Sequence, residues 1–428
     1  MIFDKPLPKN WGSKRLKYLA TYNDEVLPES TEDDKEIDYV EISGVSLTGG
    51  IEEISRMPFY QAPSRARRKV EAGDILVSTV RTYLKAIATV GTDASKDLIA
   101  STGFCVVRPG NQIDSGYLGW VAKSQPFVDE VVARSVGVSY PATNASDLAD
   151  MGIPVPPIFV QQRIVHFLDE KTARIDALIE KKQVLLERLA EKRQALITRA
   201  VTKGLNPNVR MKPSGVDWVN QIPVHWNSGN IRRFARMKTG HTPSRSMPEY
   251  WEDCTIPWFT LADVWQIRDG TRWHLGETAE KISELGLENS AAELLPAGTV
   301  ILSRTASIGF SGIMPVPMAT SQDFWNWVCG PELLPEYLLL LFRAMGDEFE
   351  LSTNGSTHKT IYQGIAAGLR ICVPEVGEQR RIVTFVLERI GELDAVRTKV
   401  SASIVSLREY RSSVITAAVT GQLPELNG

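Results

Sequence analysis

The chain has 428 residues, of which 43% are hydrophobic and 23% are charged. This length excludes a single small module and leaves room for two to four domains, and this composition excludes a disordered chain. The net charge of -3 argues mildly against a nucleic-acid-binding protein, because phosphate neutralisation usually leaves an excess of basic residues.

The beginning of the chain, MIFDKPLPKNW, lacks the basic region and apolar run of a signal peptide, and no apolar stretch is long enough to cross a bilayer. The four cysteines lie far apart and form no CxxC pair: Cys105, Cys254, Cys329 and Cys372. We therefore expect a cytoplasmic protein with no membrane contact, no disulfide framework and no zinc ribbon.

Four segments follow one another along the chain. Residues 1–154 contain short runs of Val, Ile, Tyr and Trp broken by Gly, Pro, Asn and Asp, which is typical of a strand-rich domain. Residues 155–205 repeat apolar side chains three and four positions apart, which predicts one long helix. Residues 206–370 are again strand-rich after a polar linker, and residues 371–428 predict a second long helix and a tail.

The two helical segments are copies of one another. When the chain is shifted by 218 residues, VPPIFVQQRIVHFLDEKTARIDALIEKK from Val155 aligns with VPEVGEQRRIVTFVLERIGELDAVRTKV from Val373, and 20 of 51 positions are identical. Chance predicts about three identities for average composition. The strand-rich parts repeat more distantly: LPKNW matches IPVHW, AGDILVS matches AGTVILS, and GVSYPATN lies where GSTHKTIY begins. The chain is therefore an internal duplication.

Each helix should span about 40 residues, or about 60 Å at the usual rise per residue. A helix of this length cannot bury its apolar stripe on a small domain alone, so we expect the two copies to pack on each other as an antiparallel coiled coil. The fold class is then α+β, with two strand-rich domains separated by two long helices. The alternative is two amphipathic helices that pack separately.

The usual signatures of catalysis are missing. The sequence contains no GxxxxGK[ST] loop, no GxGxxG turn after a strand, no HExxH site and no Asn-Pro-Pro-aromatic tetrad. Its five histidines are scattered without metal-ligand spacing: His166, His225, His241, His274 and His358. We predict no catalytic residue, no metal ligand and no cofactor in this chain.

The plan and the motifs resemble the DNA-specificity subunit of type I restriction-modification systems. The resemblance is carried by IPVPPIFVQQRI at Ile153, FLDEKTARIDALIEKK and EKRQALITRAVTKGLNPNV, and by GHTPSR, IPWFTLADV, LPAGTVILSRTASIG and GST in the second globular part. It covers essentially the whole chain. In the first globular part, VEISGVSLTGG at Val40 is only a loose analogue of IPWFTLADV.

The resemblance implies a non-catalytic protein with two target-recognition domains, each of which reads one half of a split double-stranded DNA site. It implies that the helices fix the unread spacer and dock two modification subunits, which methylate adenine. S-adenosylmethionine, ATP and Mg²⁺ are then expected on those partners and on the restriction and translocase subunits.

Base readout requires side chains that reach base edges, with Arg and Lys also holding phosphates. In the first domain we predict DNA contact by a basic cluster of Arg65, Arg67, Arg68 and Lys69, and the alternative for that cluster is a solvated loop. Two further candidates follow the AGDILVS strand, Arg81 and Lys85. In the second domain the candidates are Thr260, Arg304, Thr357, His358 and Lys359. For each of these the alternative is a role in local structure.

Two other functions stay open from the sequence. One is a self-contained restriction or methylation enzyme, which needs a cofactor-binding domain for which this length leaves no room. The other is a duplicated coiled-coil interaction scaffold that does not bind DNA sequence-specifically. The target sequence and the spacer length cannot be derived from the chain.

Overall fold

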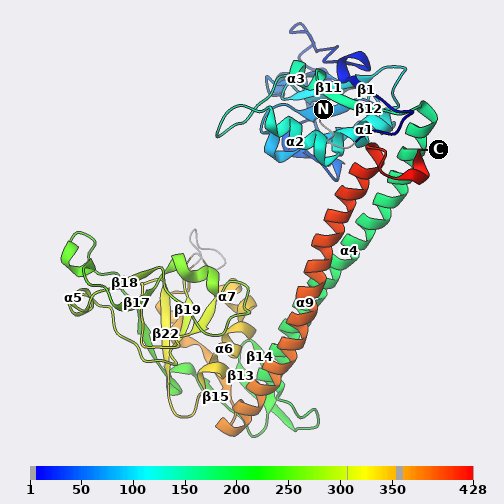
Figure 1. The fold of residues 1–428 in the computed structure, drawn as a ribbon. Helices are drawn as coiled ribbons and strands as arrows, with labels where there is room; N and C mark the ends of the chain where they lie inside the picture. The colour runs from blue at the N-terminus through cyan, green and yellow to red at the C-terminus, as the bar shows by residue number, and fades with distance from the viewer. Residues whose placement is uncertain (1–5, 306, 353–359, 428) are drawn as a thin grey trace. The chain divides into compact units, whose positions relative to one another are not determined.

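The computed structural model describes residues 6–305, 307–352 and 360–427, and these divide into two compact units. Unit 1 contains residues 1–183 and 401–428, and unit 2 contains residues 184–400. Both units draw on the two long helices, α4 (Ile158–Lys203) and α9 (Val376–Val419). The predicted α+β fold with two strand-rich parts and two long helices is confirmed (Figure 1).

Unit 1 is built on two four-stranded sheets. One has the order β6-β3-β10-β7 and the other β2-β11-β8-β9. Their bounds are β2 (Ala20–Tyr22), β3 (Glu36–Val40), β6 (Ser55–Pro58), β7 (Ala66–Lys69), β8 (Ile75–Ser78), β9 (Ile87–Thr89), β10 (Leu98–Ser101) and β11 (Phe104–Pro109). Two-stranded pairs and short helices complete the unit: β1 (Gly12–Arg15) with β12 (Gly152–Val155), β4 (Val45–Ser46) with β5 (Gly50–Ile51), α1 (Ser115–Lys123), α2 (Gln125–Ala133) and α3 (Ala145–Ala149).

Unit 2 repeats this plan. Its sheets have the orders β16-β22-β19-β20 and β18-β17-β21, with bounds β16 (Ala235–Thr239), β17 (Ile256–Phe259), β18 (Glu280–Ile282), β19 (Val300–Ser303), β20 (Ser311–Ile313), β21 (Ala319–Thr320) and β22 (Phe324–Cys329). The remaining elements are the β15 (Asn227–Asn230) and β23 (Arg370–Val373) pair, α5 (Glu284–Glu288), α6 (Pro335–Ala344), α7 (Gly346–Ser352) and α8 (Gln363–Gly368). A hairpin of β13 (Met211–Val216) and β14 (Val219–Pro223) follows α4.

The distant repeats seen in the sequence occupy matching places in the two units. AGDILVS leads into β8 and AGTVILS into β19, which are the inner strands of equivalent sheets. Both runs turn at a glycine in the left-handed region, Gly73 (φ 90°) and Gly298 (φ 84°), where a side chain would be strained. The loose analogue at Val40 is also placed alike, since β3 pairs in parallel with β10 as β17 pairs with β21. The duplication therefore extends to the strand-rich parts.

The two helices lie against each other in opposite directions within each unit. In unit 1, Arg411 of α9 donates to both carboxylate oxygens of Asp176 of α4, with Nε–Oδ1 at 2.9 Å and Nη2–Oδ2 at 3.1 Å. Farther toward the start of α4, Arg163 donates to the carbonyl oxygen of Glu425 in the tail. In unit 2 the duplicate pair is Arg193 and Asp394, 4.0 Å apart. The antiparallel packing predicted from the repeated stripe is confirmed.

A buried tyrosine ties each strand-rich part to both helices. The Tyr117 hydroxyl in α1 lies within hydrogen-bond distance of the carbonyl oxygens of Pro154 (3.1 Å) and of Val419 at the end of α9 (3.3 Å). In unit 2, Tyr337 in α6 makes the equivalent contacts with Cys372 and with Val201 near the end of α4. Each strand-rich part therefore packs on the end of the helix that belongs to the other copy.

A buried glutamine fixes the start of each helix in the same way. Gln161 donates to the carbonyl oxygen of Pro156 (2.9 Å) and accepts from the backbone N–H of Asp114 (2.7 Å), which precedes α1. Gln379 donates to Pro374 (2.8 Å) and accepts from Leu334 (2.9 Å). These bonds satisfy backbone groups that burial would otherwise leave without a partner.

Asp176→Asn should lower the free energy of unfolding by about 1–2 kcal/mol, because it removes the carboxylate from an Arg411 side chain that is 9% exposed. Burial, and next the charge of Arg411, already lower the pKa of Lys123, so a second uncompensated cation is costly there. The measurement is urea unfolding of the purified chain. Glu180→Gln, at an exposed position of the same helix, is the control, and equal stability of the two variants would contradict the prediction.

Candidate DNA interface

One turn in unit 1 brings several predicted residues together. It joins β10 to β11 at Thr102 and Gly103. The backbone N–H of Thr102 donates to the carbonyl oxygen of Arg65 (2.8 Å), and the backbone N–H of Thr79 donates to that of Gly103 (2.8 Å). Arg65 and the segment that carries Arg81 therefore flank the same turn.

The basic cluster is a strand, so the alternative of a solvated loop is wrong for residues 66–69. β7 pairs with β10, and successive side chains point to opposite faces of the sheet. The Arg67 guanidinium lies 4.7 Å from the centroid of the Phe59 ring, and the Lys69 ammonium lies 3.4 Å from a Glu25 carboxylate oxygen. Arg68 Nε is buried and makes no hydrogen bond within the described residues. Only Arg65, which is exposed, stands at the strand end beside the turn.

Arg81 and Lys85 begin and end a short 3-10 turn, η4 (Thr82–Leu84), that follows β8. Both residues have left-handed backbones, with φ of 51° and 52°, which is uncommon for residues other than glycine. Arg81 is exposed, and its guanidinium lies 5.3 Å from the centroid of the Tyr140 ring. Tyr140 belongs to the GVSYPATN run, which the sequence repeat marked as a whole. Its position beside Arg81 depends on the tertiary contact.

In unit 2 the equivalent turn joins β21 to β22 at Ser321 to Asp323. The backbone N–H of Arg304 donates to the carbonyl oxygen of Asp323 (2.9 Å), and the Arg304 guanidinium lies 4.4 Å from the centroid of the Trp325 ring. Thr305 donates to the Asp323 carboxylate (2.6 Å) and pairs with Thr360. Arg304 therefore occupies the place in unit 2 that Thr79 occupies in unit 1.

Thr260 lies on the other side of this turn but has a local structural role. Its hydroxyl accepts from the backbone N–H of Ala262 (3.2 Å) and, with Asp263, caps the 3-10 helix η7 (Leu261–Gln266). The backbone N–H of Ser321 donates to the carbonyl oxygen of Phe259 (3.0 Å), the residue before it. The other three candidates, Thr357, His358 and Lys359, lie outside the described residues.

Much of the remaining positive charge in unit 1 is neutralised by neighbours. Arg108 in β11 donates to both carboxylate oxygens of the buried Asp74 (3.0 and 2.9 Å), and these bonds raise the pKa of its guanidinium. Arg134 pairs with Glu130 (2.7 Å). In contrast, no carboxylate lies within ion-pair distance of Arg81 or Lys85 in the described part of the unit. These two cations remain available to an anionic partner.

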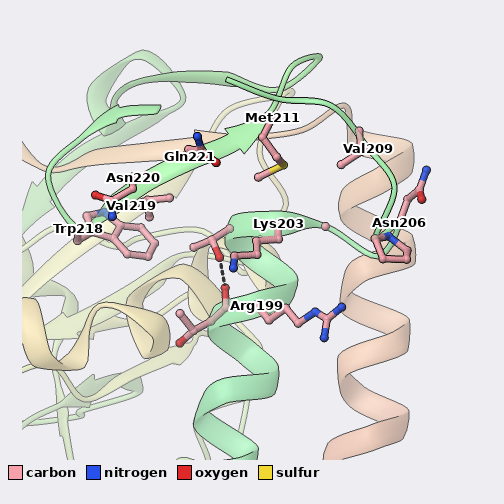
Figure 2. A pocket seen from close by; sticks show the side chains of 13 residues that line it. Arg199, Lys203, Asn206, Val209, Met211, Trp218, Val219, Asn220 and Gln221 are labelled. Carbon is pink, nitrogen blue, oxygen red and sulfur yellow. Dashed lines mark hydrogen bonds between the residues drawn. The ribbon is translucent and has the colours of Figure 1, made fainter. Parts of the chain in front are cut away.

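A cavity of about 900 Å³ in unit 2 lies elsewhere, between the end of α4 and the β13–β14 hairpin (Figure 2). Arg199 and Lys203 of α4 line one side, and Met211, Trp218 and Gln221 of the hairpin line the other. None of the predicted site residues belongs to it. No group of His, Cys, Asp or Glu that could hold a metal ion occurs among the residues that are described, and no described helix is long and apolar enough to cross a membrane.

Comparison with known proteins gives the same result for both halves of the chain. The family model of the type I restriction modification DNA specificity domain matches residues 8–188 and again residues 223–402. The specificity subunit of the type I restriction enzyme MjaIX of Methanocaldococcus jannaschii is 27% identical over 168 residues, which are 39% of this chain and 38% of that protein. The EcoprrI specificity subunit of Escherichia coli is 33% identical over 103 residues, or 24% of each chain. The aligned parts thus span well under half of these curated relatives.

Two solved structures have a similar fold. One is a chain from a structure that concerns complex assembly and conformational transition of the type I R-M system. It superposes with a TM-score of 0.80 at 22% identity, over 98% of this chain and 100% of that one. The HsdS subunit from Thermoanaerobacter tengcongensis superposes with a TM-score of 0.56, also at 22% identity, over 98% of this chain and 99% of that one.

Arg81→Ala and Arg304→Ala should each weaken binding to DNA. Loss of a guanidinium that holds a phosphate should reduce affinity equally on all sequences and lower the salt slope by about one. Loss of a guanidinium that reads a base should cost about 1–3 kcal/mol at one position of the site. The measurement is a salt titration of DNA affinity for the chain with its partners. Arg56→Ala is the control, because Arg56 of β6 pairs with Glu36 of β3. Unchanged affinity in both test variants would remove Arg81 and Arg304 from the interface.

Proposed function

The chain belongs to the type I restriction-modification DNA specificity family, and from this premise we propose that each of its two units reads one half of a bipartite DNA site. The observation that carries the proposal is the double match of one DNA specificity model, once to each half of the chain. The repeated strand order of the two units supports it, because two readers of one design can recognise two half-sites.

The turns described above suggest that the two units share one scaffold and differ in the side chains that read DNA. One four-stranded sheet and the buried tyrosine and glutamine contacts are alike in the two units, whereas the residue after the inner strand is Thr79 in unit 1 and Arg304 in unit 2. A duplicated scaffold with different exposed side chains can present different hydrogen-bonding groups to base edges. We therefore assign base and phosphate contacts to Arg65, Arg81, Lys85 and Arg304, and keep Thr357, His358 and Lys359 as candidates.

The long helices are proposed to set the length of DNA that is not read. α4 has 46 residues, and an α-helix of that length measures about 69 Å, close to two turns of B-DNA. The residues of each helix are divided between the two units, which supports this proposal. We propose that the helices also dock two modification subunits.

Methylation and cleavage are assigned to partner chains. The support is the membership of a family defined by DNA specificity, together with a sequence that has no phosphate-binding loop or zinc-hydrolase motif. S-adenosylmethionine, ATP and Mg²⁺ would then belong to the modification, restriction and translocase subunits. The first of the two similar structures comes from work on assembly of a type I R-M complex, which supports partners of this kind.

Insertion of four residues into both helices, after Gln183 in α4 and after Val400 in α9, should lengthen the unread spacer and leave both half-sites intact. Four residues add about 6 Å of helix, or about two base pairs. The readout is the set of methylated adenines in the genome of a host that expresses the complex. The same insertion in α4 alone is the control, since it breaks the match of Arg193 with Asp394 and should abolish methylation.

An altered half-site in the double-insertion variant would contradict the proposal that the helices set the length of the unread spacer. Equal affinity of the wild-type complex for cognate and random DNA would favour the second candidate function, an interaction scaffold without sequence-specific DNA binding.

A further inference from the structure

A narrow loop extends from unit 1 between α2 and α3 (Figure 1). We call residues 136–142 the finger. Val136 and Ala142 pair at its base, with N–O distances of 2.9 and 3.0 Å, and Gly137 turns the chain with a φ of 115°. Ala142 also pairs with Val80 at the end of β8. The finger is thus a loop that one β-bridge closes and a second β-bridge joins to the candidate interface.

Further hydrogen bonds fix the finger to the η4 turn. The hydroxyl oxygens of Thr82 and Ser135 lie 2.8 Å apart, and the backbone N–H of Thr143 donates to the carbonyl oxygen of Thr79 (2.8 Å). Thr82 is almost fully buried, so these contacts form under the surface. The direction of the finger is therefore set by the domain before any partner binds.

The tip of the finger is apolar and exposed. The exposed fraction is 101% for Val138 and 67% for Tyr140 at the tip, and 81% for Val136 at the base. Tyr83 of the adjoining η4 turn is 53% exposed. Single exposed apolar residues are ordinary, but a group of them on one fixed projection marks a contact surface.

The charges around the tip distinguish DNA from a protein partner. Arg81 stacks on Tyr140, Lys85 ends the same turn, and neither has an acidic partner in the described part of the unit. The cores of protein interfaces are depleted of charged residues, whereas the major groove places thymine methyl groups between two rows of phosphates. The major groove is wide enough for a helix or a two-stranded ribbon, so its width also admits a narrow loop. The strained backbones of Arg81 and Lys85 are of the kind that persist at functional sites.

We propose that the finger enters the major groove of the half-site read by unit 1, where Val138 contacts the C5-methyl group of a thymine. Tyr140 is the positioning residue that holds the Arg81 guanidinium beside the tip, toward a phosphate or a guanine edge. The inference rests on the proposed DNA-reading function and names residues for it. Val138 then contributes specificity through an apolar contact, which a search for charged and polar base readers would overlook.

The test replaces each thymine of the cognate site in turn by deoxyuridine, which lacks only the C5-methyl group. In the complete complex, one such replacement should weaken DNA binding about fourfold, as expected for one buried methyl group. Val138→Ser should weaken binding to the thymine site by a similar factor and should be indifferent to deoxyuridine at that position. Val224→Ser, at an exposed valine of unit 2, is the matched control and should keep the wild-type response.

Three outcomes overturn the inference. If Val138→Ser responds to deoxyuridine as the wild type does, Val138 does not contact the methyl group, although the proposed function stands. If the wild-type complex shows no preference for the cognate site, the proposed function itself fails. If Val138→Ser assembles poorly with the modification subunits and binds DNA normally once assembled, the finger contacts a protein.

The positioning role of Tyr140 has its own readout. Tyr140→Ala should reduce the salt slope of DNA binding as Arg81→Ala does, whereas Tyr140→Phe, which keeps the ring under the guanidinium, should restore the wild-type slope. A Tyr140→Phe variant as impaired as Tyr140→Ala would show that the hydroxyl group, and not the stacking, matters. An unchanged slope in Tyr140→Ala would remove the residue from the proposal.

Discussion

Burial of two long apolar stripes is the constraint on which the rest of the structure depends. Neither helix can cover its stripe on one small strand-rich part, so each packs on the other copy and on both units in turn. The buried tyrosines show the packing on the other copy, because the Tyr117 hydroxyl contacts the end of α9 and the Tyr337 hydroxyl contacts the end of α4. Helix residues from far along the chain join one apolar cluster of each unit, whereas other clusters lie wholly within the strand-rich parts.

Polar contacts between the two helices add to the apolar stripe in fixing their register. The Arg411–Asp176 and Arg193–Asp394 pairs are duplicates of each other, and each has a further cation nearby, Lys123 or Arg343. Burial lowers the pKa of Arg343 to about 10, and the charge of Arg193 adds to this effect. Another alignment would take the carboxylate away from these partly buried cations, which is unfavourable, so these residues favour a single register.

The small negative net charge of the protein becomes understandable once the cations are located. Arg108, Lys69 and Arg134 are paired with carboxylates, so these cations contribute little to an external field. Arg81 and Lys85, in contrast, have no carboxylate within ion-pair distance in the described part of the unit, and their turn is held by the finger. A protein that contacts DNA together with partner subunits needs unpaired positive charge only at a few points of its surface. The overall net charge does not reveal such a local excess.

The sequence by itself determined the duplication, the two long helices and the α+β class, because periodicity and repetition are properties of neighbouring residues. It also marked Arg304 and the GVSYPATN run through the repeat. Only the tertiary structure decided that residues 66–69 form a strand with split faces, that Thr260 caps a helix, and that Arg81 lies against Tyr140 59 positions later. Those facts depend on which strand ends meet at one turn, and chain spacing carries no information about such long-range contacts.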